Sequence, residues 1–264
     1  MATWHNATGR PLASEDWLEA HHRAKLPERT NFARSLTRLQ PARIVDLGCA
    51  TGLWLEIFHE LLPDTCEFIG LDTDPDALAL ARQRAASWKR QVSFEECDFE
   101  LDAASIPAAD LTLAFNVFSY IEDLPLFLDK LASRLPRGNV AIRQYDGAGL
   151  RFGPMDTATR QSIEAALRAA VEPSVQFRHY DMDRVYSAIA HSSFTQRAVA
   201  FETFARASPF PDDFLEYYRG TMKWTLQHLS IDAAELLKCW LSDESDDFEP
   251  PRYFLEVDLT AVLS

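Results

Sequence analysis

From Arg43 onward, short apolar runs alternate with segments of helical spacing. The runs are RIVDL, EFIGLD, VSFEECD, LTLAFN and NVAIRQYD, and helical patterns such as LWLEIFHELL and DLPLFLDKLASRL stand between them. After the second run, Asp74 can cap a helix whose first turn holds Pro75 and Asp76. Strands that are separated by helices pair in parallel through crossover connections. This order therefore predicts an α/β fold built on a mostly parallel sheet.

The two ends of the chain follow other patterns. SEDWLEAHHRAKL, with Ser14 as a cap, and the segment that begins at Pro27 predict two helices before residue 41. Beyond Gly147, two helical segments precede the β-rich TQRAVAFETF, and an aromatic-rich helical insertion separates it from the last strand, PRYFLEVDLTAVL. Two late strands joined by such an excursion predict an antiparallel end to the sheet.

The charge balance disfavours several kinds of partner. Forty Asp and Glu against 26 Lys and Arg give a formal net charge of -14, which would repel a phosphate backbone. No apolar run approaches the roughly 20 residues that span a bilayer, and the N-terminus lacks a basic segment followed by a hydrophobic one. The four cysteines show no C-x-x-C spacing, so neither a zinc site nor a disulfide framework is indicated. We expect a cytoplasmic protein with neither nucleic-acid nor membrane partners.

The turn after the first run is the most informative site. In ARIVDLGCATGLWL, Gly48, Ala50 and Gly52 would let the backbone approach a ligand closely at a helix N-terminus. Dinucleotide enzymes use a related G-x-G-x-x-G turn for an anionic pyrophosphate. Here Asp46 places a carboxylate two residues before the first glycine, which favours a cationic ligand, although Asp46 alone is equally explained as a helix cap.

Acidic residues also end the second and third runs. Asp72 stands where an acid can accept both hydroxyls of an adenosine ribose, a feature shared with NAD enzymes. Asp98 offers an acceptor for an adenine amine, and Phe99 offers an apolar ring for the base. A lone Asp at a strand end is usually a turn residue, but three such acids at successive strand ends favour one nucleoside ligand.

VDLGCATG resembles the first motif of the class I S-adenosylmethionine-dependent methyltransferases, and FIGLDTDPDALALAR resembles their second. The resemblance covers roughly residues 40–146 and implies S-adenosyl-L-methionine as cofactor. In that family the glycine turn contacts the methionine part and the acid that ends the second strand holds the ribose. Many members have Gly where this chain has Ala50. The cofactor-binding residues that the resemblance implies are Asp46, Gly48, Cys49, Ala50, Gly52, Asp72, Thr73, Asp98, Phe99 and Asn116.

With this resemblance, the expected fold is a Rossmann-like, mostly parallel seven-stranded sheet with helices on both faces and an antiparallel last strand. A helical cap would come from the N-terminus and from the C-terminal insertion. The expected parts are an N-terminal helical lid (1–40), a cofactor-binding core (41–146) and a substrate-side region (147–264) whose helical insertion spans about 206–249.

The acceptor-specific motifs of the family are missing. The fourth run ends FNVFSY, not with the Asn or Asp and two prolines typical of amino-group methylation of DNA or protein, and no cysteine precedes proline. These absences favour O- or N-methylation of a small molecule, in secondary metabolism, by a monomer or homodimer. The alternatives are an inactive cofactor-binding partner or regulatory protein, and another reaction such as a cyclisation. No metal is expected, because the places of the family's metal ligands carry Asn116 and Asp146-Gly147.

If the acceptor is a hydroxyl, a general base is useful. The candidate residues are Tyr120, Tyr145, Asp146 and His179; for His179, a plain surface or core histidine is favoured over a catalytic one. Arg143 lies in an apolar strand, where pairing with an internal acid is favoured over contact with an anionic substrate. Arg151 is freer to meet a substrate carboxylate. An aromatic stripe in the insertion, from Phe214 to Trp224, is either the insertion's own core or part of a lid over an apolar acceptor.

Overall fold

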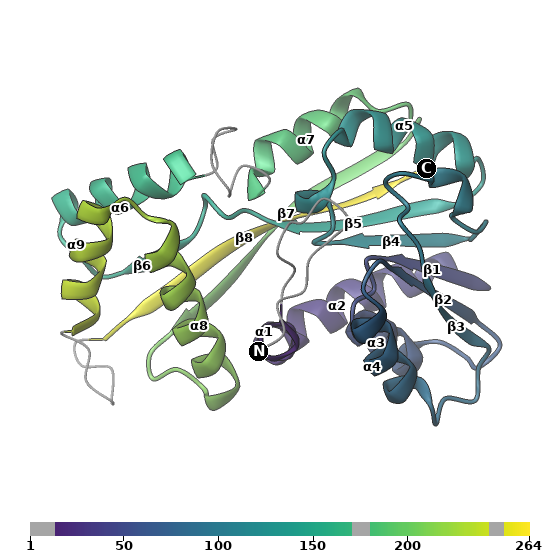
Figure 1. Ribbon diagram of the computed structural model, residues 1–264, viewed down its shortest axis with the longest axis horizontal. Coiled ribbons are helices and arrows are strands. Elements are labelled where there is room, and N and C mark those ends of the chain that lie inside the picture. Colours follow the sequence, from purple (N-terminus) through teal and green to yellow (C-terminus); the bar gives the residue numbers. More distant parts are fainter. Residues whose placement is uncertain (1–13, 171–179, 243–250) are drawn as a thin grey trace.

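The computed structural model describes residues 14–170, 180–242 and 251–264. Its described strands form one sheet of order β3-β2-β1-β4-β5-β8-β6, with β7 paired along the whole length of β8 (Figure 1). The strands are β1 (Arg43–Leu47), β2 (Glu67–Asp72), β3 (Val92–Glu96), β4 (Leu111–Phe115), β5 (Asn139–Tyr145), β6 (Arg151–Gly153), β7 (Arg197–Ala207) and β8 (Tyr253–Leu263).

Pairing directions agree with the sequence. Strands β1 to β5 pair in parallel, whereas β8 runs antiparallel to β5, β6 and β7. The Rossmann-like sheet and the antiparallel last strand are therefore confirmed, and the short β6 is an eighth strand that the sequence did not indicate. Because the strand order reverses between β1 and β4, a crevice is expected outside the carboxyl ends of these two strands.

Helices cover both faces of the sheet. They are α1 (Glu15–Ala24), α2 (Leu26–Leu36), α3 (Leu53–Leu61), α4 (Pro75–Ala85), α5 (Leu124–Arg134), α6 (Thr157–Ala170), α7 (Met182–His191), α8 (Asp212–His228) and α9 (Ile231–Ser242). Side chains of α5 and α7 pack on one face, and those of α2, α3 and α4 pack on the other. The expected caps are present: the Ser14 hydroxyl accepts from Trp17 N, and the Asp74 carboxylate accepts from Asp76 N and Ala77 N.

The long β7–β8 ribbon extends beyond the parallel strands and carries a second group of helices (Figure 1). Helices α6, α8 and α9 pack around its far end in a separate apolar cluster. Phe214, Tyr217 and Tyr218 lie inside that cluster and are almost fully buried, so this part of the aromatic stripe is the core of the insertion. Residues 243–249 of the expected insertion lie outside the described residues.

Candidate functional site

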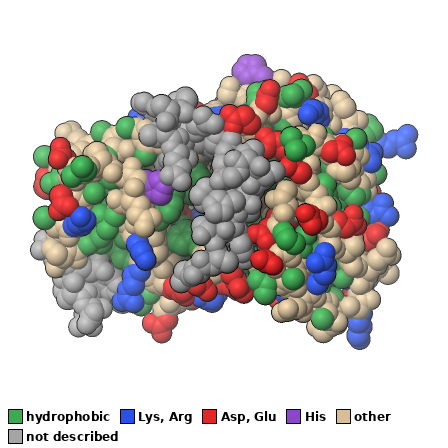
Figure 2. All heavy atoms as spheres, in the orientation of Figure 1, with side chains coloured by type: hydrophobic (Ala, Val, Ile, Leu, Met, Phe, Trp, Pro, Cys, Tyr) green, Lys and Arg blue, Asp and Glu red, His purple; other side chains and the backbone are tan. Residues whose placement is uncertain are grey.

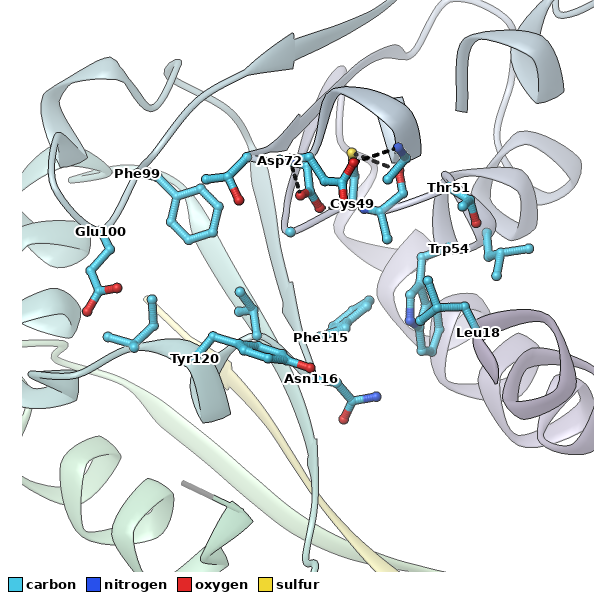
Figure 3. A pocket seen from close by; sticks show the side chains of 18 of the residues that line it. Leu18, Cys49, Thr51, Trp54, Asp72, Phe99, Glu100, Phe115, Asn116 and Tyr120 are labelled. Atoms are coloured by element: carbon cyan, nitrogen blue, oxygen red, sulfur yellow. Dashed lines mark hydrogen bonds between the residues drawn. The ribbon is translucent and has the colours of Figure 1, made fainter. Parts of the chain in front are cut away.

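A cavity of about 560 Å³ opens at the carboxyl edge of the parallel strands, where the strand order reverses. Its walls come from the turn after β1, the segments after β2, β3 and β4, and helices α1 and α2. Figure 3 shows Asp72, Cys49 and Thr51 along one wall, Phe99 and Glu100 on another, and Tyr120 and Asn116 below them. The volume is in the range of small-molecule and cofactor sites.

The turn after β1 has the conformation that its glycines allow. Gly48 (φ 66°) and Gly52 (φ 79°) are left-handed, and a Cβ on Gly48 would lie 2.9 Å from Cγ2 of Val117. Ala50 is also left-handed (φ 46°), a conformation that costs a residue with a Cβ about 1–2 kcal/mol. Gly48 N and Cys49 N donate to Leu71 O at 2.8 and 3.0 Å, which ties the turn to β2. Gly48, Cys49 and Ala50 line the cavity, whereas Gly52 serves as the N-cap of α3.

Asp72 joins this turn to the next one. Its carboxylate accepts hydrogen bonds from Ala50 N (2.8 Å) and Asp74 N (3.0 Å), and Asp72 and Thr73 both line the cavity. Burial raises the pKa of Asp72 despite these amide donors. A carboxylate held by two backbone amides is fixed in position and keeps lone pairs for a ligand hydroxyl.

Two buried oxygens beside the turn have no hydrogen-bond partner among the residues that the structure describes. They are Oδ2 of Asp46 and the hydroxyl oxygen of Thr51. Thr51 lines the cavity, while Asp46 lies behind the wall at 2% exposure. Burial, and then the charge of Asp72, raise the pKa of Asp46 well above its ordinary value. A ligand that brings hydrogen-bond donors or a positive charge would satisfy this end of the cavity.

The segment after β3 supplies the opposite wall. Asp98, Phe99, Glu100 and Leu101 line it, and Asp98 Oδ1 accepts from Leu101 N at 3.2 Å. The Phe99 ring is 6% exposed and packs at 5.9 Å from the ring of Phe127. This wall combines one anchored carboxylate with one apolar ring, as the sequence predicted for an adenine site.

Polar aromatic side chains form the end near β4 and β5. Asn116 is left-handed (φ 56°) and accepts from Tyr145 N through its side-chain oxygen at 3.3 Å. The hydroxyls of Tyr120 and Tyr180 lie 3.2 Å apart. Burial raises the pKa of Tyr120, Tyr145 and Tyr180, so all three line the cavity as neutral phenols at neutral pH. Neutral phenols are hydrogen-bonding groups and poor bases.

Helices α1 and α2 bring four lining residues that the sequence did not single out: Trp17, Leu18, His21 and Arg29. Arg29 is 5% exposed and its guanidinium nitrogens lie 2.9 Å from His22 Nδ1 and 3.2 Å from His21 Nδ1. In the sequence, a cation and two histidines on one amphipathic segment are as typical of a solvated helix face as of a cavity wall. Only the packing of α1 against α8 and of α2 against α3 turns them inward.

Other predicted residues lie elsewhere. Asp146 is not among the lining residues, since its carboxylate accepts from Ala148 N (3.1 Å) within its own loop. His179 lies outside the described residues. Arg143 pairs with Asp258 (2.5 Å) and Glu202 (2.7 Å), which confirms the internal pairing. Arg151 is half-exposed on β6, 3.8 Å from Glu164 and away from the cavity, so the expectation that it is free for a substrate was wrong.

Two further features concern residues 14–170, 180–242 and 251–264. These residues contain no cluster of three or more His, Cys, Asp or Glu side chains placed to hold a metal ion. None of their helices has both the length and the apolar character needed to cross a membrane. Figure 2 shows acidic side chains spread over the visible face, with Lys and Arg side chains lying singly among them.

An open parallel sheet with a glycine turn at its reversal point defines a Rossmann-like, nucleoside-binding class of fold. Residues 45–141 match the family profile described as a methyltransferase domain. A trans-aconitate 2-methyltransferase of Methylobacterium nodulans is 34% identical over 139 residues, 50% of either chain. A ubiquinone biosynthesis O-methyltransferase of Nitrobacter winogradskyi is 32% identical over 108 residues, 41% of this chain and 40% of that one.

The chain thus spans about half the length of the curated relatives it matches. The crystal structure of the YcgJ protein from Bacillus subtilis aligns over 92% of this chain and 98% of its own, with a TM-score of 0.50 and 15% identity, a likeness of fold. The segment from residue 45 to residue 141 is a class I S-adenosylmethionine-dependent methyltransferase domain.

Proposed function

We propose that this chain transfers the methyl group of S-adenosylmethionine to a small-molecule acceptor bound in the same cavity. The observation that carries the proposal is the arrangement of Asp72, the left-handed turn at Gly48 and the Thr51 hydroxyl around one cavity at the reversal point of the sheet, with the buried carboxylate of Asp46 behind its wall. This end is acidic and hydrogen-bond accepting, which suits a ligand with an ammonium, a sulfonium and ribose hydroxyls.

The residues of the cavity divide by chemistry. Asp72, with Thr73 beside it, would hold the ribose, because its carboxylate is already fixed by two amides. Asp98 and Phe99 would contact the adenine. The turn residues and Asn116 would surround the methionine part, with Asp46 behind the turn. S-Adenosylmethionine supplies a sulfonium-activated methyl group, so little bond polarisation is asked of the protein.

The remaining walls suit an acceptor held away from water. Trp17, Tyr120, Tyr145 and Tyr180 line that end, and helices α1 and α2 close one side of it. Positioning of the acceptor and exclusion of water supply the acceleration in an in-line methyl transfer. Because the lining phenols are neutral, we favour an acceptor whose oxygen or nitrogen atom is nucleophilic without the help of a strong base.

The matched relatives support a small acceptor, since their names refer to trans-aconitate and to ubiquinone biosynthesis. On this proposal residues 14–40 serve as a lid, residues 41–146 as the cofactor-binding core, and the region after residue 147 completes the acceptor side. The reaction needs no metal, so we expect a chelator to leave the rate unchanged.

Isothermal titration with S-adenosylhomocysteine tests the cofactor site. Wild type should bind, and Asp72→Asn should weaken binding by about 10- to 100-fold through loss of charge-assisted hydrogen bonds. Asp212→Asn, a matched change at an exposed acid on α8 outside the cavity, should bind like wild type. Equal binding by wild type and Asp72→Asn would remove the site assignment.

Methyl transfer is tested with labelled S-adenosylmethionine and a panel of organic acids, phenols and amines. A labelled product that disappears with Asp72→Asn supports the proposal. Cofactor binding without any product across the panel, together with a stable protein partner on pull-down, would replace it by the alternative of an inactive cofactor-binding subunit.

A further inference from the structure

Arg29 is a buried cation on the cavity wall that lacks an anionic partner. Among the described residues that line the cavity it is the one Lys or Arg, and no carboxylate of the described residues lies within ion-pair distance of it. The neighbouring buried cations differ in this respect. Lys25 pairs with Glu256 and Asp258, and Arg143 pairs with Asp258 and Glu202. Asp258, the acid whose charge acts on Arg29, is thus already paired with these two cations.

The two histidines orient the guanidinium but leave its charge in place. A guanidinium only donates hydrogen bonds, so Nδ1 of His21 and Nδ1 of His22 must accept from Arg29. Burial, and then the charge of Arg29, lower the pKa of His21 far below its ordinary value and that of His22 to about 3. Both rings are therefore neutral near pH 7 and carry their proton on Nε2.

The donors that remain point to the missing partner. Two of the five N–H groups of Arg29 are used by the histidines, and the others have no acceptor among the residues described. His21, which also lines the cavity, adds an Nε2–H without a hydrogen-bond partner in the described part of the chain. Burial lowers the pKa of Arg29 to about 10, so the group stays protonated at neutral pH. A buried charge with free donors is unfavourable until an anion joins it.

The position of Arg29 indicates where in the cavity an anionic group of a ligand would bind. Its guanidinium lies 5.0 Å from the ring of Trp54, in the first turn of α3 directly after the glycine turn. The ring of His21 lies 6.4 Å from that of Tyr145 and stacks on Tyr217 at 5.1 Å. The free donors therefore stand between the glycine turn and the tyrosine end, within the space shared by cofactor and acceptor.

We propose that Arg29, held by His21 and His22, binds a carboxylate group of a molecule seated in this cavity. A planar carboxylate matches the guanidinium fork and accepts two parallel hydrogen bonds. The inference rests on the proposed function, and that function provides two sources of the group: the methionine part of the cofactor, and an acceptor that is an organic acid. His21 and His22 act through Arg29 and are positioning residues.

Titration calorimetry with four ligands distinguishes the two sources. The probes are S-adenosylhomocysteine, its decarboxylated analogue S-adenosyl-3-thiopropylamine, and, in the presence of S-adenosylhomocysteine, trans-aconitate and its triamide. The variants are Arg29→Met and Arg29→Lys. The control is Arg206→Met, which removes a cation paired with Glu28 of the same helix α2, outside the cavity.

If the group belongs to the cofactor, wild type should prefer S-adenosylhomocysteine over the decarboxylated analogue by about 10- to 100-fold, and Arg29→Met should abolish that preference. If it belongs to the acceptor, the same loss should fall on the preference for trans-aconitate over its triamide. Arg29→Lys should keep part of either preference, because it retains the charge and loses the fork.

The wild-type comparisons need no variant, so a poorly folding variant does not leave the proposal open. Wild type that binds S-adenosylhomocysteine but shows neither preference overturns the assignment of Arg29 and leaves the proposed function standing. A preference that survives Arg29→Met in a folded protein also overturns it. Wild type that binds no S-adenosylhomocysteine overturns the proposed function itself.

Discussion

Replacing Asp258 by Asn should destabilise the protein far more than removing a surface ion pair. Asp258 on β8 is 2% exposed and lies 2.5 Å from Arg143 and 3.4 Å from Lys25, two cations that are buried to a similar degree. The substitution leaves both cations with less compensating charge in a buried site. Breaking a buried pair in this way costs about 3–5 kcal/mol.

The expected fall in melting temperature follows from the size of the chain. For a protein of this length each kcal/mol moves the melting temperature by roughly 2–4 °C, so Asp258→Asn should lower it by about 10 °C. The control is Glu216→Gln, which breaks a 2.5 Å pair with Arg23 at 46% and 59% side-chain exposure. An exposed pair of this kind contributes about 0–1 kcal/mol, a shift in melting temperature of roughly 4 °C at most.

Differential scanning calorimetry and urea unfolding measure both variants. The sign of the pH dependence provides a second check. Although burial acts to raise it, Lys25 and then Arg143 hold the pKa of Asp258 below its ordinary value. This stabilisation is complete above about pH 4, the pKa of an Asp in the unfolded chain. It is lost as the pH falls through the lower pKa that Asp258 has in the folded protein. A shift for Asp258→Asn no larger than that for Glu216→Gln at pH 7 would refute the reasoning.

Three further predictions concern the site and its supports. Asp74→Ala removes the N-cap of α4 and should cost about 1 kcal/mol in urea unfolding; an unchanged midpoint would show that the cap contributes nothing. Ala50→Gly should relieve the left-handed strain and raise stability by up to about 1 kcal/mol, less the entropy that glycine adds to the unfolded chain; a drop in midpoint contradicts this. Tyr120→Phe and Tyr145→Phe should leave the shape of the rate profile from pH 6 to 9 unchanged, because the raised pKa of each phenol lies above that range; loss of an alkaline inflection in either variant would assign that tyrosine as a base.

Much of the fold was readable from local patterns. Alternating apolar runs and helical segments predicted β1 to β5 with their helices, and the caps at Ser14 and Asp74 marked two helix starts correctly. These signals are local, because a cap bonds within three residues and a helix repeats every 3.6 residues. The short β6 gave no such signal, since three residues around Phe152 pair only because β8 lies beside them.

Some residues of the candidate site were likewise predictable from the sequence, and others were not. The turn at Gly48 and the acids at strand ends are set by the carboxyl edge of a parallel sheet, so chain order alone brought Asp72 and Asp98 to one cavity. Asp146 also ends a strand, yet its carboxylate turns to Ala148 N in its own loop, a choice that depends on backbone direction after the strand.

By itself, then, the sequence determined the strands, the helices between them and the acidic turn after the first strand, because each depends on residues close together in the chain. The tertiary structure decided which charged side chains form ion pairs with one another. Lys25 and Arg143 are neutralised by acids more than 100 residues away on β8, while Arg29, close to both, is left facing the cavity with two neutral histidines. Pairing between buried charges depends on distance in space and on burial, and neither is written in chain order.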